Sequence, residues 1–216
     1  MKRPVLLLVA ALLWGGGAQA DTTLHLPGLV VHGEGEPYIE ATGKVALTNG
    51  ILEFVAVEPE GRDYESLLTL DCKPSVLQSA LLLIGCETSA VRQIAANASA
   101  GTPLVLEVSW VAGGKARRVP VESLFVDRNT GKPPPPLPWI FNGSYFILHP
   151  ITSNRVFQAD EERAHVALWW QPAIPINLGG DRGNPYTGEA QGFEANTAAL
   201  PAKGTRVVLI LRKRER

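Results

Sequence analysis

The chain has 216 residues, of which 45% are hydrophobic and 19% are charged, with a formal net charge of −1 at pH 7. This composition excludes a globally disordered chain, because enough apolar side chains are present to bury a core. The charge is not concentrated in a basic face, so a nucleic-acid partner is not expected.

The first twenty residues have the three-part layout of a secretory signal peptide. Lys2 and Arg3 precede an apolar stretch from Val5 to Trp14, and small residues follow as far as Ala20. That stretch is shorter than the ~20 residues that cross a membrane, so we expect cleavage after Ala20 and no membrane span afterwards. Removing two of the 20 basic residues leaves 18 against 21 acidic ones, a net charge of −3. The sequence therefore predicts an exported protein, periplasmic or secreted.

Residues 21–40 are interrupted by Gly and Pro and are predicted to be an extended lead-in to a single globular domain at residues 41–212. Within this domain, Asn49-Gly50 separates two β-prone runs and predicts a hairpin. The segment from Tyr64 to Leu70 predicts a further strand.

A helix is predicted over residues 74–84. Pro74 suits the first helical position and Gly85 suits the residue just past a helix end. The few polar residues of this segment share one narrow stripe, so we expect the helix to be strongly buried. A weaker second helix is predicted at residues 90–96.

The second half of the chain reads mainly as strands. Gly113-Gly114 predicts another hairpin, and the four consecutive prolines within residues 132–138 predict a stiff connector. Further strands are expected in segments 139–148, 164–170 and 205–212, with a flexible surface loop at 171–192 and a basic tail at 213–216. The predicted fold class is α+β, with mainly antiparallel, hairpin-connected strands.

The two cysteines lie at opposite ends of the predicted helix. A helix over residues 74–84 separates Cys72 from Cys86 by ~16 Å, whereas a disulfide requires Cα atoms within about 7 Å. We therefore expect no disulfide, with Cys86 acting as a small buried side chain. Cys72 precedes a helix N-terminus, where a thiol can have a lowered pKa, so it is a candidate redox residue.

The remaining candidate residues form two groups. Ser66 follows Glu65 but lies inside a predicted strand, outside the sequence contexts of activated serines. The four histidines have no metal-binding spacing, so neither a metal nor a cofactor is expected. A polar rim around the predicted helix comprises Glu65, Ser66, Asp71, Cys72 and Gln78. A candidate aromatic face comprises Trp139, Tyr145, Trp169 and Trp170.

Several motifs together resemble the YdjY-like domain family of exported bacterial proteins. They are a Glu-Ser strand, Pro-Ser before an Ala-Leu-Leu-Leu helix, Phe-x-Gly-Ser at 141–144 and Pro-x-x-Gly-Thr at 201–205. The resemblance covers residues 41–212 and implies export and a compact α+β domain, without an established reaction. It also implies histidines at positions held here by Tyr64 and Gln78, so a metal or acid/base role for those positions is not expected in this chain.

The sequence favours a non-catalytic binding module of the bacterial envelope, with an envelope protein or a small ligand as its partner. The alternative is a redox accessory protein or a hydrolase that uses Cys72 or Ser66. No complete catalytic motif is present to support the alternative.

Overall fold

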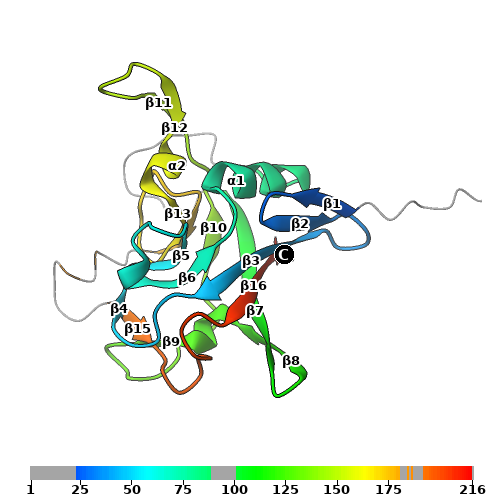
Figure 1. Ribbon diagram of the computed structural model, residues 1–216, viewed down its shortest axis with the longest axis vertical. Coiled ribbons are helices and arrows are strands. Elements are labelled where there is room, and N and C mark those ends of the chain that lie inside the picture. The colour runs from blue at the N-terminus through cyan, green and yellow to red at the C-terminus, as the bar shows by residue number, and fades with distance from the viewer. Residues whose placement is uncertain (1–22, 89–100, 181–183, 185, 187–191, 216) are drawn as a thin grey trace, which may run out of the picture.

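The computed structural model describes residues 23–88, 101–180, 184, 186 and 192–215 (Figure 1). Eight strands form a closed β-barrel, because the last strand of the sheet, β6, pairs back onto β3. In ring order the strands are β3 (Tyr38–Val45), β16 (Arg206–Lys213), β7 (Thr102–Ala112), β10 (Trp139–Phe141), β14 (Ile176–Leu178), β13 (Ala164–Ala167), β5 (Phe54–Val57) and β6 (Ser66–Leu70).

The predicted α+β class is wrong, because strands make up 44% of the structure and helices 13%. The barrel is also not built from hairpins alone. Strands β5 and β6 are parallel, as are β13 and β14. A two-residue hairpin joins only antiparallel strands, so these pairs depend on longer connections.

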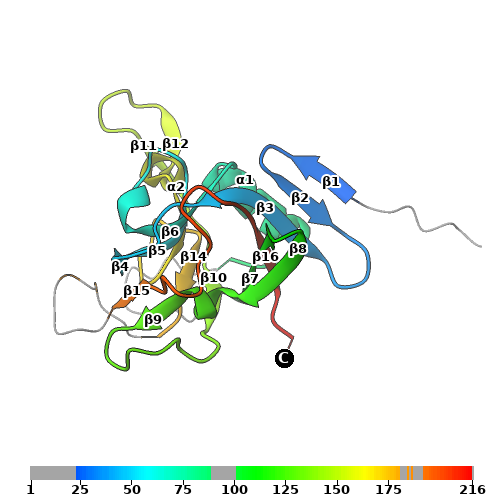
Figure 2. The same ribbon diagram turned by 60° about the horizontal axis from the view of Figure 1, so that its bottom comes forward.

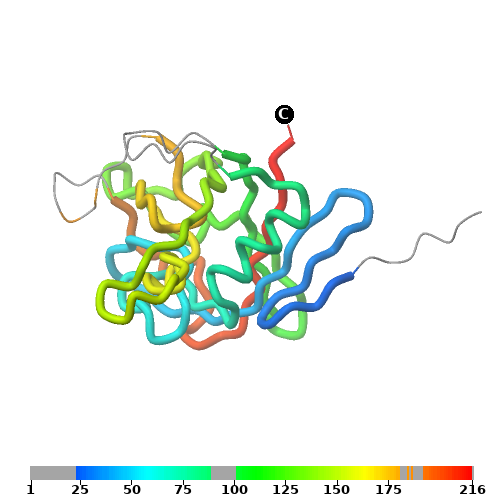
Figure 3. The backbone as a smooth tube through the Cα atoms, turned by 90° about the horizontal axis from the view of Figure 1, so that it is seen from above, coloured from blue at the N-terminus to red at the C-terminus, as the bar shows by residue number. Residues whose placement is uncertain are grey.

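Helix α1 (Pro74–Leu83) lies across one end of the barrel (Figure 3). It contacts both β3 and β13, which are not neighbours in the ring. The predicted helix is therefore present, with Pro at its first turn and Gly85 beyond its end. It is less buried than expected, because Leu82 and Leu83 face solvent at 47% and 62% exposure. The second predicted helix, at 90–96, lies outside the described residues.

A three-stranded sheet lies at the opposite end of the barrel, in the order β4 (Ile51–Leu52), β15 (Phe193–Ala195) and β9 (Phe125–Asp127) (Figures 1 and 2). The hairpin predicted at Asn49-Gly50 is wrong, because β4 pairs with β15 and not with β3. The chain turns at this dipeptide, but the strands that β4 joins are β15 and β9. Their buried residues Phe193 and Phe125 pack ring against ring.

Three hairpins extend from the barrel. Strand β2 (Leu29–His32) pairs with the first half of β3, and β1 (Thr23–Leu26) pairs with β2, so the predicted lead-in supplies strands of the same sheet. Strand β8 (Lys115–Pro120) pairs with β7, which confirms the hairpin at Gly113-Gly114; both glycines have the positive φ that its turn requires. Among the described residues, strands β11 (Phe146–Leu148) and β12 (Arg155–Phe157) pair only with each other, and they project beyond the five-residue helix α2 (Gln158–Glu162).

The strands of the barrel differ in whether one or both of their faces are buried. On β7, buried and partly exposed residues alternate, as expected where one face packs on a core and the other meets solvent; β16 follows this pattern except that Leu209, Ile210 and Leu211 are all buried. Strands β5, β13 and β14 are buried on both faces. Ile174, in the segment between β13 and β14, covers Phe54 and Ala167 from outside the barrel. Strand β14 itself lies within the segment predicted as a flexible loop, so that prediction is wrong for residues 176–178.

The other expected strands are present with different limits. Segment 139–148 is divided by residues 142–145 into β10 and β11, and segment 164–170 is a strand only as far as Ala167. Within the described part of the chain, no helix is long and apolar enough to span a membrane. The predicted signal peptide, residues 1–20, lies outside the described residues.

Candidate functional site

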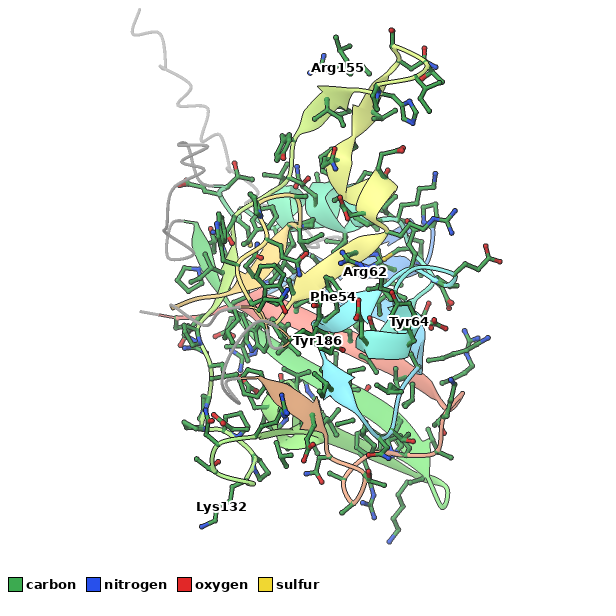
Figure 4. The ribbon with its side chains drawn as sticks, turned by 90° about the vertical axis from the view of Figure 1, so that its left-hand side faces the viewer. Phe54, Arg62, Tyr64, Lys132, Arg155 and Tyr186 are labelled. Atoms are coloured by element: carbon green, nitrogen blue, oxygen red, sulfur yellow. The ribbon has the colours of Figure 1, made fainter. Side chains whose placement is uncertain are left out.

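The guanidinium of Arg62 is surrounded by three carboxylates from separate parts of the chain. It lies 3.6 Å from Glu53, between β4 and β5, and 3.9 Å from Glu65, in the short 3-10 helix Asp63–Glu65. The third contact is 3.4 Å to Glu162, the last residue of α2. Arg62 also lies 4.2 Å from the centroid of the Phe54 ring (Figure 4). With Phe54 and Tyr186, these four charged residues are called the Arg62 cluster below.

Parallel pairing of β5 and β6 brings the two acidic residues together. Phe54 and Ser66 are partners in that pairing, and Glu53 and Glu65 immediately precede them. The backbone N–H of Glu53 donates to the carbonyl oxygen of Glu65 at 2.9 Å. The Ser66 hydroxyl donates to the carbonyl oxygen of Arg62 at 2.5 Å, which holds the turn that carries the guanidinium.

Burial leaves Glu53 and Glu65 with unusual protonation behaviour. Both residues are more than nine-tenths buried. Burial raises the pKa of Glu53, the nearby Glu65 raises it further, and Arg62 lowers it. Burial likewise raises the pKa of Glu65, against the lowering effects of Arg62 and of a hydrogen bond from Tyr186. The favourable contacts with Arg62 and Tyr186 therefore do not fully offset the cost of burying these two carboxylates.

The cluster is accessible from solvent on one side. The Arg62 and Glu162 side chains are about a third exposed, and Tyr186 is about half exposed. Tyr64, which precedes Glu65, is 69% exposed, and Figure 4 shows both tyrosines close to Arg62 on the same side of the molecule. A ligand that reaches the carboxylates would meet aromatic rings first.

The structure does not bring the residues of the predicted polar rim together. Glu65 belongs to the Arg62 cluster, whereas Ser66 is fully buried. Asp71 accepts a hydrogen bond from Thr42 on the outer surface of the barrel. Gln78, on α1, accepts a hydrogen bond from the backbone N–H of Ser144 at 2.7 Å. The Gln78 side chain therefore holds the loop after β10.

Cys72 is buried beside His165, with 3.8 Å between Sγ and Nε2. Burial raises the pKa of the Cys72 thiol to about 12 and lowers that of the His165 imidazole to about 4. The lowered thiol pKa expected from the helix N-terminus is therefore wrong, because loss of solvent outweighs the helix dipole. Cys86 is also a buried free thiol, and burial raises its pKa to about 11. The described residues contain no group of three or more metal-ligand side chains.

The predicted aromatic face is only partly at the surface. Trp139 is fully buried, and its indole Nε1 donates to the carboxylate of Glu122 at 2.9 Å. Tyr145, Trp169 and Trp170 are half-buried. Trp169 and Trp170 follow Leu168, whose N–H donates to the carbonyl oxygen of Glu53, a residue of the Arg62 cluster.

Sequence reasoning identified Glu65 but missed Glu53, Arg62, Glu162 and Tyr186. One signal was available: Glu53 interrupts the otherwise apolar segment Ile51 to Val57, and acidic residues are rarely buried without a partner. The contact between Arg62 and Glu162 spans a hundred residues and has no local signature.

Comparison of the chain with protein-family models, with curated proteins and with solved structures finds no significant match. The YdjY-like resemblance therefore stays a prediction, and the functional argument depends on the geometry.

Proposed function

We propose that the protein is a binding module whose Arg62 cluster takes a ligand that carries a protonated amine. The observation that supports this is a charge imbalance: three carboxylates contact a single guanidinium, and two of them are buried with raised pKa values. A second positive charge beside Glu53 and Glu65 would stabilise their ionised forms.

The rings around the cluster support the same ligand class. The face of an aromatic ring attracts cations, and Arg62 already uses the face of Phe54 in this way. Tyr64 and Tyr186 present exposed rings at the same surface. An ammonium group would therefore meet ring faces at the entrance and carboxylates further in.

The alternative functions receive no support from the geometry. Cys72 and Ser66 are at most 2% exposed, and the Ser66 hydroxyl donates to a backbone carbonyl instead of a base. A substrate could reach neither side chain without movement of the strands around it. Export to the bacterial envelope is also part of the proposal. It depends on the predicted signal peptide, which lies outside the described residues.

Isothermal titration calorimetry with spermidine as the probe tests this function. We expect saturable binding that releases protons and strengthens as the pH rises through the raised pKa values of Glu53 and Glu65, because the amine favours their ionised forms. The released protons are measured by repeating the titration in buffers of different ionisation enthalpy.

Two variants and one matched control locate the binding. Glu53→Gln and Glu65→Gln should each weaken spermidine binding about tenfold, which corresponds to about 1.4 kcal/mol. Glu60→Gln removes an acid that is 88% exposed and lies outside the cluster, so it should leave the affinity unchanged. Equal losses in all three variants would indicate non-specific attraction to an acidic surface and would contradict the proposal, as would no binding at all.

A further inference from the structure

Arg62 fills the position in its cluster that a cationic ligand would be expected to take. Each nitrogen of its guanidinium faces a different carboxylate: Nη1 faces Glu53 at 3.6 Å, Nε faces Glu65 at 3.9 Å and Nη2 faces Glu162 at 3.4 Å. The central carbon of the guanidinium lies over the Phe54 ring, 4.2 Å from its centroid (Figure 4). Carboxylates and aromatic faces are the groups that hold cations in proteins, so Arg62 occupies a cation site built by its own chain.

The contacts of Arg62 are longer than those of a strong ion pair. Hydrogen bonds between a guanidinium and a carboxylate are typically about 2.7–2.9 Å long, and Arg118 lies 2.6 Å from Glu107 elsewhere in this chain. Of the three contacts made by Arg62, only the one with Glu162 is short enough to be a hydrogen bond. Arg62 therefore holds the two buried carboxylates less tightly than a guanidinium is able to.

The backbone of Arg62 limits how closely its guanidinium approaches these carboxylates. The carbonyl oxygen of Arg62 accepts hydrogen bonds from the Ser66 hydroxyl at 2.5 Å and from the backbone N–H of Glu65 at 3.3 Å. These two bonds fix the point from which the side chain extends, at the start of the short 3-10 helix. A ligand has no such attachment, so its cationic group is free to approach both buried carboxylates at hydrogen-bond distance.

The Arg62 side chain is able to move outward without disturbing the core. It is 31% exposed, whereas the side chains of Glu53 and Glu65 are 8% and 10% exposed. Rotation toward solvent would break the two long contacts and keep the shorter one with Glu162, which lies at the surface. With a ligand between Glu53 and Glu65, each of the three carboxylates would still have a cation beside it.

We propose that Arg62 is an internal competitor of the ligand: the cationic group of the ligand enters between Glu53 and Glu65 and moves the Arg62 guanidinium outward to Glu162 alone. The arrangement with all three contacts is then the closed form of the site. The apparent dissociation constant equals the intrinsic one divided by the fraction of chains in the open form. This inference rests on the proposed amine binding and describes how the chain restrains it.

Isothermal titration calorimetry with spermidine tests the competition. Arg62→Lys keeps the positive charge, but a single ammonium cannot meet three carboxylates and a ring together, so we expect binding about threefold tighter than in the wild-type chain. Arg62→Gln removes the competitor and should tighten binding about tenfold. Arg163→Gln is the matched control: it removes an exposed positive charge next to Glu162 in the sequence, leaves Arg62 in place and should change the affinity less than about twofold.

Thermal unfolding supplies a second readout, because Arg62→Gln is also expected to be less stable than the wild-type chain. A ligand that binds only the folded state stabilises it more when it binds more tightly. Saturating spermidine should therefore raise the unfolding midpoint of Arg62→Gln by more than that of the wild-type chain. Circular dichroism shows that each variant is folded before the titrations.

The possible results separate this inference from the proposed function. Spermidine binding that Glu53→Gln weakens, but that neither Arg62 variant strengthens, would leave the amine site in place and overturn the competition. A gain in Arg163→Gln as large as that in Arg62→Gln would overturn it too, because occupation of the cluster by Arg62 would then not matter. Absence of binding in the wild-type chain and in both Arg62 variants would refute the proposed function and this inference with it.

Discussion

The imidazole of His165 donates its Nε2 hydrogen to the carbonyl oxygen of Cys72 at 2.8 Å, and neither side chain reaches solvent. A carbonyl oxygen can only accept, so the hydrogen of the neutral ring resides on Nε2. The other ring nitrogen, Nδ1, is buried without a partner. This bond joins strand β13 to Cys72, two residues before the start of α1, and it is burial that keeps the ring neutral, because burial lowers its pKa.

Acid should destabilise the protein through His165. The pKa of this histidine is about 4 in the folded chain against 6.5 for an ordinary histidine, so between these values only the unfolded chain takes up the proton. The free energy of unfolding should therefore fall by on the order of 3 kcal/mol across that range. Urea unfolding at several pH values measures it, with His165→Gln as the control that lacks the titrating ring. Equal pH dependence in the two proteins would contradict this account.

Both cysteines should resist alkylation in the folded protein. Cys72 and Cys86 are at most 3% exposed, and their thiols have pKa values of about 12 and about 11. Thiolate at neutral pH is therefore scarce as well as inaccessible. Intact mass after iodoacetamide treatment should show no adduct in native buffer and two adducts in urea. A single native adduct at Cys72 would restore the case for a reactive thiol.

Replacing Arg62 by Gln should destabilise the fold at neutral pH. The change leaves Glu53 and Glu65 buried without their counter-charge, and we expect a loss of about 2 kcal/mol. The loss should shrink as the pH falls, because the raised pKa values allow both acids to protonate at a higher pH than ordinary glutamates do. Arg206→Gln removes a 70% exposed partner of Asp71 and should cost less than about 0.5 kcal/mol in the same unfolding experiment. Similar losses of unfolding free energy for Arg62→Gln and Arg206→Gln would mean that Glu53 and Glu65 do not need Arg62 as a counter-charge.

Glu53→Gln should raise stability while it weakens amine binding. The neutral side chain avoids burying a charge beside Glu65, and Arg62 keeps its two other carboxylate partners. We expect a gain of about 1 kcal/mol near pH 7, measured as a higher thermal midpoint. A lower midpoint would show that the ion pair with Arg62 outweighs the burial of Glu53.

Closure of the barrel should depend on Gly43. A Cβ atom at this position of β3 would lie 2.1 Å from the carbonyl oxygen of Thr69 on β6, so the two strands could not keep their present spacing. We expect Gly43→Ala to cost about 3 kcal/mol or more in urea unfolding. A Cβ atom at Gly35 would meet no atom within 4 Å, so only the positive φ of this residue disfavours Gly35→Ala. We expect that variant to cost about 1 kcal/mol. Equal costs would contradict the role given to Gly43.

Local signals in the sequence predicted local structure. Pro74 and Gly85 correctly marked helix α1, and Gly113-Gly114 correctly marked the β7–β8 hairpin. The same reasoning failed at Asn49-Gly50, because the partner of β4 is β15, more than a hundred residues further along the chain. Turn residues specify where a chain bends but not which strand it then meets.

Barrel closure and the candidate site both depend on contacts between residues that are far apart in the sequence. Strand β14 was hidden in a segment rich in Gly and Pro, since its three residues are too few to show a period. Glu65 could be singled out from its sequence, but its relation to Glu53 required the parallel pairing of β5 and β6. Cys72 was misjudged for a similar reason: His165 of β13, which lies against its thiol in the core, is 93 residues away in the sequence.

The position of β16 in the ring constrains how the chain can fold. This last strand pairs with β3, near the start of the described chain, and with β7, in its middle. Without residues 206–213, β3 and β7 would each lack a neighbour on one edge. A chain truncated before β16 would therefore present two open strand edges to chaperones and proteases.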